Sequence, residues 1–366
     1  ECNIQPANWV TVDKDEEEMY NDGGLFPASD LIIDDLPYTE LQFMDNDSIS
    51  PYVIASFDIE CDSSHGDFPL PNKDFQKLAI DIYDSIHRCH TNNVPTDTFI
   101  LFIPICIKAA FEYYDLSQVN KSLDISRIYS VSDVKPCQDS IKEFKELFYD
   151  SSFIEDFLNP KKRDPVIKRL TKELNNLQDE SGHVIKIEGD KVIQIGTVFH
   201  KYGDIEPYKR HILVIAPQDD LPDDQICDDL DNIEVIRCKN EKALLLGWKD
   251  IMKKEDPDFV TGYNIFGFDF GYMLDRMKVY CCNKKPYCDK WCPYNKFLNM
   301  GKIDSTSWAS CYHRNKRCSV IKKKTMTFGS ADYNRYIHMD GRVLYDLQKE
   351  VEKGHNLESY KLDNVA

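Results

Sequence analysis

The order of hydrophobic and polar positions divides the chain into stretches of different periodicity. Tyr52 to Cys61 is a run of apolar, β-branched and aromatic residues, which is typical of a buried strand. Similar runs return later in the chain and alternate there with apolar positions at helical spacing. They predict strands at 191–200, 211–216, 233–238 and 259–262, and helices at 241–254 and 269–280. Strands followed by strand–helix alternation predict a mixed α/β sheet.

The stretch between these strands has a different pattern. Its apolar residues recur at the spacing of amphipathic helices, which we expect at 75–89, 140–157 and 166–177. The opening residues, in contrast, are polar and rich in turn formers. The sequence therefore predicts three parts: the end of an N-terminal domain at 1–51, a sheet domain at 52–72 and 191–366, and a mainly helical insert at 73–190.

Composition restricts the classes of protein that fit this pattern. The chain has 366 residues, of which 42% are hydrophobic and 30% charged, as in a globular protein with a proper core. Its 63 acidic and 45 basic residues give a net charge of −18, which disfavours a basic nucleic-acid clamp and a binder of anionic membranes. The longest apolar run, Phe99 to Ile107, is much shorter than the roughly 20 residues that cross a bilayer. We therefore expect no membrane partner, and the acidity leaves open an enzyme that reaches nucleic acid through metal ions.

The chain contains 13 cysteines and no recognisable secretory signal, so reduced thiols or a metal site are expected rather than a disulfide framework. Cys281, Cys282, Cys288 and Cys292 fall within twelve residues. Four thiolates of this kind would make a tetrahedral zinc site. The spacing lacks the usual pair of C-x-x-C knuckles, however, and free cysteines are the preferred interpretation.

Three acidic residues stand out by their context. Asp58 and Glu60 come at the end of the first buried strand, and their i, i+2 spacing places them on one face of it. Asp269 begins a predicted helix. Buried carboxylates need neutralising cations, and Mg²⁺ prefers sites made only of oxygen ligands. The alternative for the first two residues is an ordinary pair of solvated acids at a strand end.

Two motifs around these acids resemble a known family. Ser56-Phe-Asp58-Ile-Glu60-Cys61 resembles the first exonuclease motif of family B DNA polymerases, and Gly262-Tyr-Asn264-Ile-Phe-Gly-Phe268-Asp269 resembles the second, N-x-x-x-F-D. The resemblance covers about residues 1–70 and 190–366 in the family's order. Its supporting segments, which favour the polymerase delta branch, lie at 8–12, 194–195, 256–258, 340–346 and 357–365.

This resemblance implies an RNase H-like (DnaQ-like) fold and a 3′→5′ proofreading exonuclease that hydrolyses the primer 3′ end. By the family pattern, Asp58, Glu60 and Asp269 would be catalytic and would hold two Mg²⁺ ions, with Mn²⁺ as an alternative. Asn264 would position the single-stranded 3′ end of a primer–template, and Phe268 would pack beneath the site. The two ions would activate water and stabilise the leaving oxygen.

The resemblance also implies that the chain is a fragment. The family's third motif, Y-x-x-x-D, is expected downstream of Ala366, because Asp346 and Asp363 fit helix-cap or surface roles better. DNA-directed DNA polymerase activity and contact with a sliding clamp are expected in the missing C-terminal part. The insert resembles those of giant-virus polymerases. A replicative polymerase would work inside the cell, in the nucleus or in a viral replication factory in the cytoplasm.

Two other interpretations remain open at this point. The chain would be a non-catalytic scaffold that binds DNA or a replication partner, or a free-standing exonuclease without a polymerase part. The sequence that follows Ala366 distinguishes them, because a third exonuclease motif followed by polymerase motifs favours the polymerase.

Overall fold

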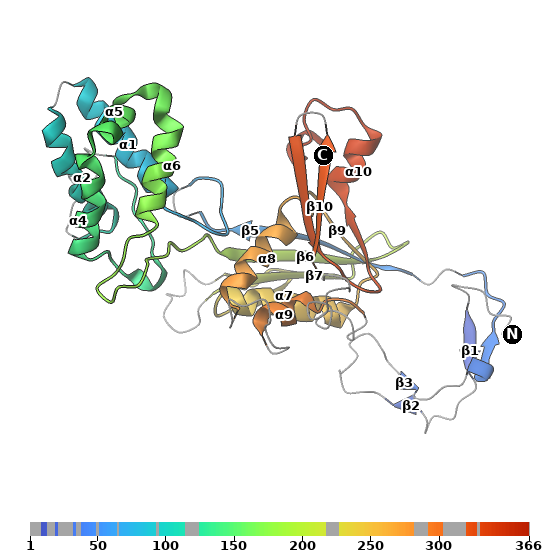
Figure 1. The fold of residues 1–366 in the computed structure, drawn as a ribbon. Coiled ribbons are helices and arrows are strands. Elements are labelled where there is room, and N and C mark those ends of the chain that lie inside the picture. The colour runs from blue at the N-terminus through green and yellow to red at the C-terminus, as the bar shows by residue number, and fades with distance from the viewer. Residues whose placement is uncertain are drawn as a thin grey trace. The chain divides into compact units, whose positions relative to one another are not determined.

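The computed structural model separates the chain into two compact units (Figure 1). The sheet unit consists of Glu1–Asp62 and Lys191–Ala366, and the insert is Ser63–Asp190. The structure describes residues 9–12, 19–20, 32–33, 38–48, 51–63, 66–92, 95–113, 124–216, 227–281, 292–302, 320–327 and 330–365.

The described residues of the sheet unit form a six-stranded sheet in the order β12-β9-β5-β6-β7-β8. Its strands are β5 (Val53–Cys61), β6 (Val192–Lys201), β7 (Lys209–Ile215), β8 (Glu234–Cys238), β9 (Phe259–Gly262) and β12 (Val343–Asp346). β5 is antiparallel to β6 and parallel to β9, and β12 is parallel to β9 on its other side. β6 and β7 are antiparallel, whereas β7 and β8 are parallel. The predicted mixed α/β sheet is therefore confirmed.

Helices pack against this sheet through a common apolar core. They are α7 (Glu241–Glu255), α8 (Asp269–Val279) and α9 (Pro293–Leu298). The Phe57 ring of β5 lies 4.8 Å from the Trp248 ring of α7 and 5.2 Å from the Phe270 ring of α8, measured between ring centroids. Because one strand contacts both helices, the end of β5 has a fixed position relative to the start of α8.

Smaller elements complete the sheet unit. The strand pairs are β1 (Val10–Val12) with β4 (Leu41–Phe43), β2 (Met19–Tyr20) with β3 (Ile32–Ile33), and β10 (Val320–Thr327) with β11 (Ser330–Ile337). The short helices are η2 (Tyr38–Glu40), α10 (Leu347–Gly354) and α11 (Leu362–Val365).

The insert is helical and has a hydrophobic core of its own. Its described helices are α1 (Gln76–Thr91), α2 (Thr96–Ala110), α4 (Gln138–Glu146), α5 (Ser151–Leu158) and α6 (Arg163–Leu174), with the 3₁₀ turns η3 (Val131–Asp133), η4 (Leu147–Tyr149) and η5 (Pro160–Lys162). The insert begins at Ser63, earlier than the expected residue 73. The reason is a buried carboxylate, Asp190, which accepts hydrogen bonds from the Leu70 N–H (2.9 Å) and the Lys73 ammonium (2.5 Å). These bonds fasten the segment before α1 to the last residue of the insert.

The chain leaves the sheet unit and returns to it at neighbouring residues, Asp62 and Lys191. The N–H of Asp62 donates to the carbonyl of Lys191 at 2.8 Å, directly beyond the paired residues Cys61 and Val192. β5 and β6 are therefore continuous antiparallel neighbours, and the insert occupies the position of a hairpin connection between them.

Candidate active site

Strand β5 presents its two acids on one face. Asp58 and Glu60 are exposed, whereas Phe57 and Ile59 on the other face are buried in the core of the sheet unit. This alternation follows from the two-residue period of a strand. The predicted placement of Asp58 and Glu60 on a common face is thus observed.

The segment after β9 approaches the same end of β5. A Cβ atom on Gly262 would lie 2.6 Å from the Phe57 carbonyl oxygen, so only glycine permits this closeness. Parallel β5 and β9 also direct their carboxyl ends to one edge of the sheet. Side chains that follow either strand therefore meet at this edge, as ligand-binding groups do in many α/β proteins.

Asn264 forms a tight turn between β9 and α8. Its backbone has a φ of 60°, and its carbonyl accepts hydrogen bonds from the N–H groups of Gly267 (3.0 Å) and Phe268 (2.9 Å). Asparagine is one of the residues that tolerate this left-handed conformation. A Cβ atom on Gly267 would lie 2.3 Å from the Asn264 Oδ1 atom, so the glycine leaves room for the amide side chain.

Asp269 is the first residue of α8 and only 2% exposed. Burial, together with the nearby negative charge of Asp58, raises the pKa of the Asp269 carboxyl to about 7. Among the described residues, its Oδ1 atom has no hydrogen-bond partner. A buried carboxylate without compensation is costly, and an oxygen-binding cation would supply what is missing.

The two acids of β5 differ in their relation to Asp269. Asp58 acts directly on the pKa of Asp269, so the structure brings these two carboxyls together. Within the described ranges, however, no three His, Cys, Asp or Glu side chains gather as a metal-ligand group. Glu60 shares the face of Asp58 but does not complete such a group. The assembled part of the site is the Asp58–Asp269 pair.

Phe268 lies immediately before Asp269 and is partly buried against the core of the sheet unit. Its ring centroid is 5.2 Å from that of Tyr272, one turn further along α8. The neighbouring Cys61 is no candidate nucleophile, because burial raises the pKa of its thiol to about 12. The residues around the acid pair are thus mainly packing groups.

Sequence reasoning missed one contributor to the site. Asp346, the last residue of β12, is buried and accepts hydrogen bonds from the N–H groups of Asn264 (3.1 Å) and Phe266 (2.9 Å). Its predicted role as a helix cap is confirmed by a 3.0 Å bond from the Gln348 N–H. Its hydrogen bonds to the loop at Asn264 and Phe266 could have been suspected from its position at the end of a strand, which it shares with Asp58.

The cysteine cluster is only partly described. The Sγ atoms of Cys281 and Cys292 lie 3.5 Å apart, next to the end of α8 and the start of α9. Cys282 and Cys288 lie outside the described residues. The zinc site therefore stays an untested alternative to the free cysteines that the sequence favours.

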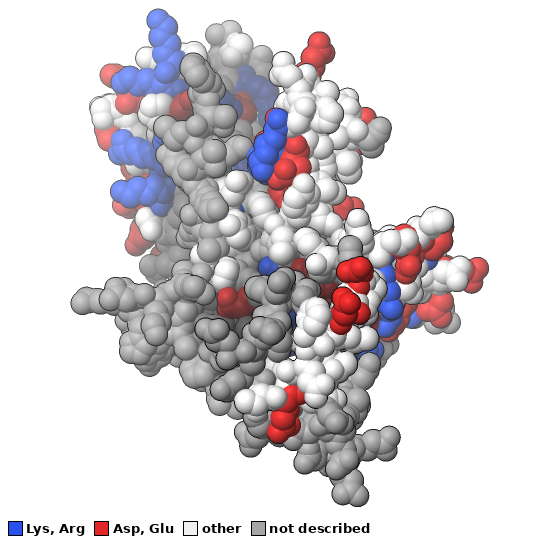
Figure 2. All heavy atoms as spheres, turned by 90° about the vertical axis from the view of Figure 1, so that its right-hand side faces the viewer, with Lys and Arg blue, Asp and Glu red and all other residues white. Residues whose placement is uncertain are grey.

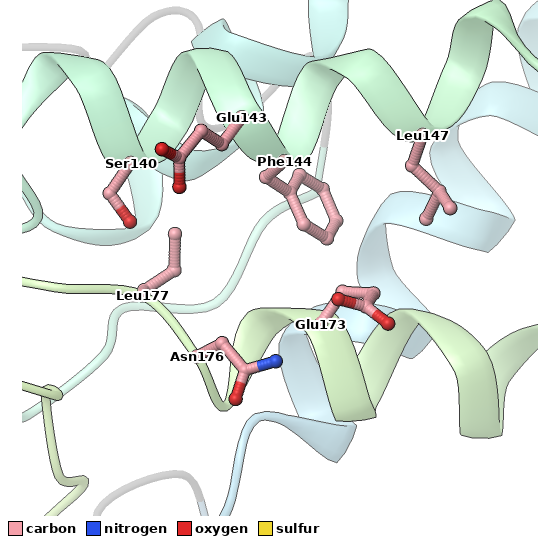
Figure 3. A pocket seen from close by; sticks show the side chains of 7 residues that line it. All are labelled: Ser140, Glu143, Phe144, Leu147, Glu173, Asn176 and Leu177. Atoms are coloured by element: carbon pink, nitrogen blue, oxygen red, sulfur yellow. The ribbon is translucent and has the colours of Figure 1, made fainter.

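A cavity of about 270 Å³ lies between α4 and α6 of the insert (Figure 3). Its polar lining includes the carboxylates of Glu143 and Glu173, while Phe144 contributes an apolar wall. The Ser140 hydroxyl accepts a 3.0 Å hydrogen bond from the Gln178 N–H and so belongs to the local fold. This lining is that of a gap between two packed helices and differs from the paired acids of the sheet unit.

Both signs of charge occur on the described part of the face that Figure 2 shows, where Lys and Arg side chains are interspersed with Asp and Glu. For the residues that the structure describes, we find no helix with both the length and the apolar character that a bilayer crossing requires.

Comparison with known proteins identifies the family. The family model described as "DNA polymerase family B, exonuclease domain" matches residues 1–130 and 110–365. The chain is 28% identical over 383 residues to a DNA polymerase of Pyramimonas orientalis virus, covering 100% of this chain and 29% of the relative. It is 29% identical over 410 residues to a DNA polymerase of Phaeocystis pouchetii virus, covering 99% of this chain and 37% of the relative.

A cellular relative matches a shorter part of the chain. The DNA polymerase delta catalytic subunit of Dictyostelium discoideum is 30% identical over 183 residues, which cover 49% of this chain and 14% of that protein. The chain spans about a third of the length of the two viral relatives. With the family model matching nearly its whole length, the chain belongs to DNA polymerase family B and contains the exonuclease domain of that family.

Proposed function

We propose that the sheet unit is a 3′→5′ proofreading exonuclease that hydrolyses the terminal phosphodiester of a primer 3′ end. The observation that carries this proposal is the Asp58–Asp269 pair, a buried carboxyl of raised pKa beside a second acid at the carboxyl ends of parallel strands. Perturbed acids in such a position are typical of catalytic sites. The family match supports the same reaction class.

The proposed fold of the sheet unit is RNase H-like (DnaQ-like). Three consecutive antiparallel strands, β5, β6 and β7, are extended by parallel strands β9 and β12 on the β5 side. This order supports the assignment. We further propose that residues 1–51 end an N-terminal domain, although they cluster with the sheet unit; the described strands β1 to β4 pair with one another and not with the six-stranded sheet, which supports this division.

The donor set at the site fits divalent cations. Asp58, Glu60 and Asp269 offer only oxygen atoms, which suit Mg²⁺ or Mn²⁺, and the unpartnered Oδ1 of Asp269 is suited to a cation. Two bound ions would lower the pKa of water and neutralise charge on the leaving oxygen. Because the pKa of Asp269 is about 7, cation binding near neutral pH would displace a proton from this carboxyl.

The other residues of the motif would act on the DNA strand. The Asn264 amide stands at a rigid turn, where a side-chain amide can orient a sugar or phosphate of a single-stranded 3′ end. Phe268 would support the site from beneath through its contact with Tyr272. These roles are positional, and hydrolysis would need no covalent intermediate with the protein.

The parent protein is proposed to be a replicative DNA polymerase, and the names of its relatives, DNA polymerase and DNA polymerase delta catalytic subunit, support this proposal. DNA-directed polymerase activity and binding to a sliding clamp would then belong to sequence outside this chain. Such an enzyme would act where DNA is replicated inside the cell, in the nucleus or in a viral factory in the cytoplasm.

The test is Mg²⁺-dependent degradation of single-stranded DNA by the full-length protein. We expect Asp58→Ala and Asp269→Ala each to lower the rate by at least about two orders of magnitude, the order typical for loss of one group that stabilises transition-state charge. Asp156→Ala, which removes an exposed acid of the insert, is the matched control and should leave the rate unchanged. Undiminished degradation by both site variants would overturn the proposal. An inactive wild-type protein that still binds DNA would favour a scaffold.

A further inference from the structure

We propose that Asp346 is a positioning residue for Asn264, and that its carboxylate holds the loop between β9 and α8 in the conformation that the exonuclease site needs. This inference rests on the proposed function. It concerns a residue outside both recognised motifs, about 80 positions beyond the loop in the sequence.

The sheet places Asp346 opposite the start of the loop. β12 and β9 are parallel, and in their register Asp346 lies beside Gly262, the last residue of β9. Asp346 is 2% exposed, so its carboxylate has little access to water and depends on partners within the protein.

Those partners come from two separate segments. Oδ1 accepts from the Asn264 N–H at 3.1 Å and from the Gln348 N–H of α10 at 3.0 Å. Oδ2 accepts from the Phe266 N–H at 2.9 Å. One carboxylate therefore joins the loop to the first turn of α10, and it uses both oxygens to do so.

The hydrogen bonds from Asp346 reach the loop at Asn264, a residue with a positive φ. Asn264 has a positive φ of 60°, which asparagine tolerates better than most residues but which still costs energy relative to a right-handed conformation. Asp346 holds the N–H of this residue and that of Phe266, and it thereby fixes Ile265 between them. The carbonyls of Asn264 and Ile265 in turn accept the N–H groups of Phe268 (2.9 Å) and Phe270 (3.1 Å), which lead into α8. The chain of bonds thus runs from Asp346 through Asn264 to the helix that carries Asp269.

Capping α10 does not by itself require an aspartate. Serine and asparagine also cap helices, through a single side-chain oxygen. Only a carboxylate accepts hydrogen bonds on both oxygens, since an asparagine would turn an NH₂ group toward one of the donors. The pair of loop bonds, rather than the cap, is the feature that calls for Asp at position 346.

The experiment uses the full-length protein and compares Asp346→Asn, Asp346→Ser, Asn264→Ala and the double variant Asp346→Asn/Asn264→Ala. Steady-state hydrolysis of single-stranded DNA with Mg²⁺ gives KM and kcat. We expect Asp346→Asn and Asp346→Ser to raise KM about tenfold, the order expected for loss of a hydrogen bond to a charged group. If Asp346 acts through Asn264, the double variant should be no worse than Asn264→Ala alone.

Two further measurements separate positioning from stability. Asp190→Asn removes an equally buried carboxylate of the insert, and it should lower the unfolding temperature without changing KM. Amide hydrogen exchange at Asn264 and Phe266 should become faster in Asp346→Ser, which keeps the cap of α10. Independent, multiplicative effects of Asp346→Asn and Asn264→Ala on KM, or unchanged exchange at both amides, would overturn the inference. An inactive wild-type protein would contradict the proposed function alone, because hydrogen exchange still decides the inference.

Discussion

The sheet unit and the insert both bury carboxylates, but the hydrogen-bond partners of these carboxylates differ between the two units. In the insert, Asp190 is 4% exposed and accepts hydrogen bonds from the Leu70 N–H and the Lys73 ammonium. Asp81 is also buried and accepts from the Ser126 N–H at 2.9 Å. In the sheet unit, Asp269 is similarly buried, yet one of its oxygens has no hydrogen-bond partner among the described residues and the charge that acts on its pKa is that of another acid, Asp58. The carboxylates of the two units thus differ in their hydrogen-bond partners rather than in how deeply they are buried.

The difference is local to the site and does not extend through the sheet unit. Glu241 at the start of α7 is 1% exposed and fully satisfied. It accepts from the Val192 N–H (2.8 Å), the Arg276 guanidinium (2.7 and 2.8 Å) and the Tyr280 hydroxyl (2.6 Å). Glu241 is thus fully compensated, whereas one oxygen of Asp269 has no hydrogen-bond partner among the described residues, and this contrast supports the proposed role of the acid pair.

The largest effect on stability is expected when Glu241, which neutralises the buried Arg276, is removed. Glu241→Ala would leave the buried Arg276 guanidinium without its anion, and we expect the free energy of unfolding to fall by about 3–5 kcal/mol. Denaturant unfolding followed by circular dichroism measures the change. The double variant Glu241→Met/Arg276→Met replaces both partners with apolar side chains and should cost clearly less. A loss below about 1 kcal/mol for Glu241→Ala would show that the pair is not a stabilising centre of the sheet unit.

Smaller effects on the free energy of unfolding, opposite in sign to each other, are expected at the buried aspartates Asp190 and Asp269. Asp190→Asn should destabilise the protein by about 1–3 kcal/mol, because asparagine keeps only one acceptor oxygen for Leu70 and Lys73 and turns an NH₂ group toward the other donor. Asp269→Asn should stabilise it by a similar amount at pH about 8 in the presence of a chelator, since asparagine avoids the cost of a buried charge.

The gain at Asp269 should depend on pH in a defined way. The folded pKa of about 7 lies above the ordinary value of 3.8. The wild type therefore loses stability as the pH rises through this interval, because the unfolded chain releases the proton first. The advantage of Asp269→Asn should vanish at pH about 4 and be complete above pH about 7, as measured by thermal unfolding. Destabilisation at both pH values would contradict the view that Asp269 is uncompensated.

Features of the fold and the site that depend on neighbouring residues in the sequence could be predicted, whereas those that depend on distant residues could not. The strand containing Asp58 and the helix that begins at Asp269 follow local periodicity, and both were predicted within a residue or two. The meeting of Asp58 with Asp269 depends on the parallel pairing of β5 with β9, across about 200 positions of sequence. Only the resemblance to ordered family motifs indicated it in advance.

Asp346 shows where sequence reasoning stopped. No pattern in the sequence predicted β12, and a helix cap or a surface position was the expected role of the aspartate. The cap was correct. The bonds to Asn264 and Phe266 depend on the register of β12 against β9, and no local pattern encodes that register.

The smallest effect is expected at His211 on β7, whose buried ring nitrogens lie 3.3 Å from Glu234 and 3.7 Å from Glu255. Its ring is 2% exposed and packs edge-on against Phe199, and neither ring nitrogen has a hydrogen-bond partner within the described residues. The charged groups that face it are Glu234, Glu255, Lys209 and Lys254. Burial is the main cause that lowers the pKa of His211 below the ordinary value of 6.5, although both glutamates oppose it.

A lowered folded pKa means that the unfolded chain takes up a proton before the native protein does. The contribution of His211 to stability is therefore present above pH 6.5 and is lost as the pH falls below it. We expect His211→Phe to flatten the decline in unfolding temperature between about pH 7 and 5, where unperturbed histidines change charge. His183→Gln, at an exposed position of the insert, should leave the slope unchanged. Equal slopes in the wild type and His211→Phe would show that the protein compensates the protonated ring, and the contrast between the units would then rest on Asp269 alone.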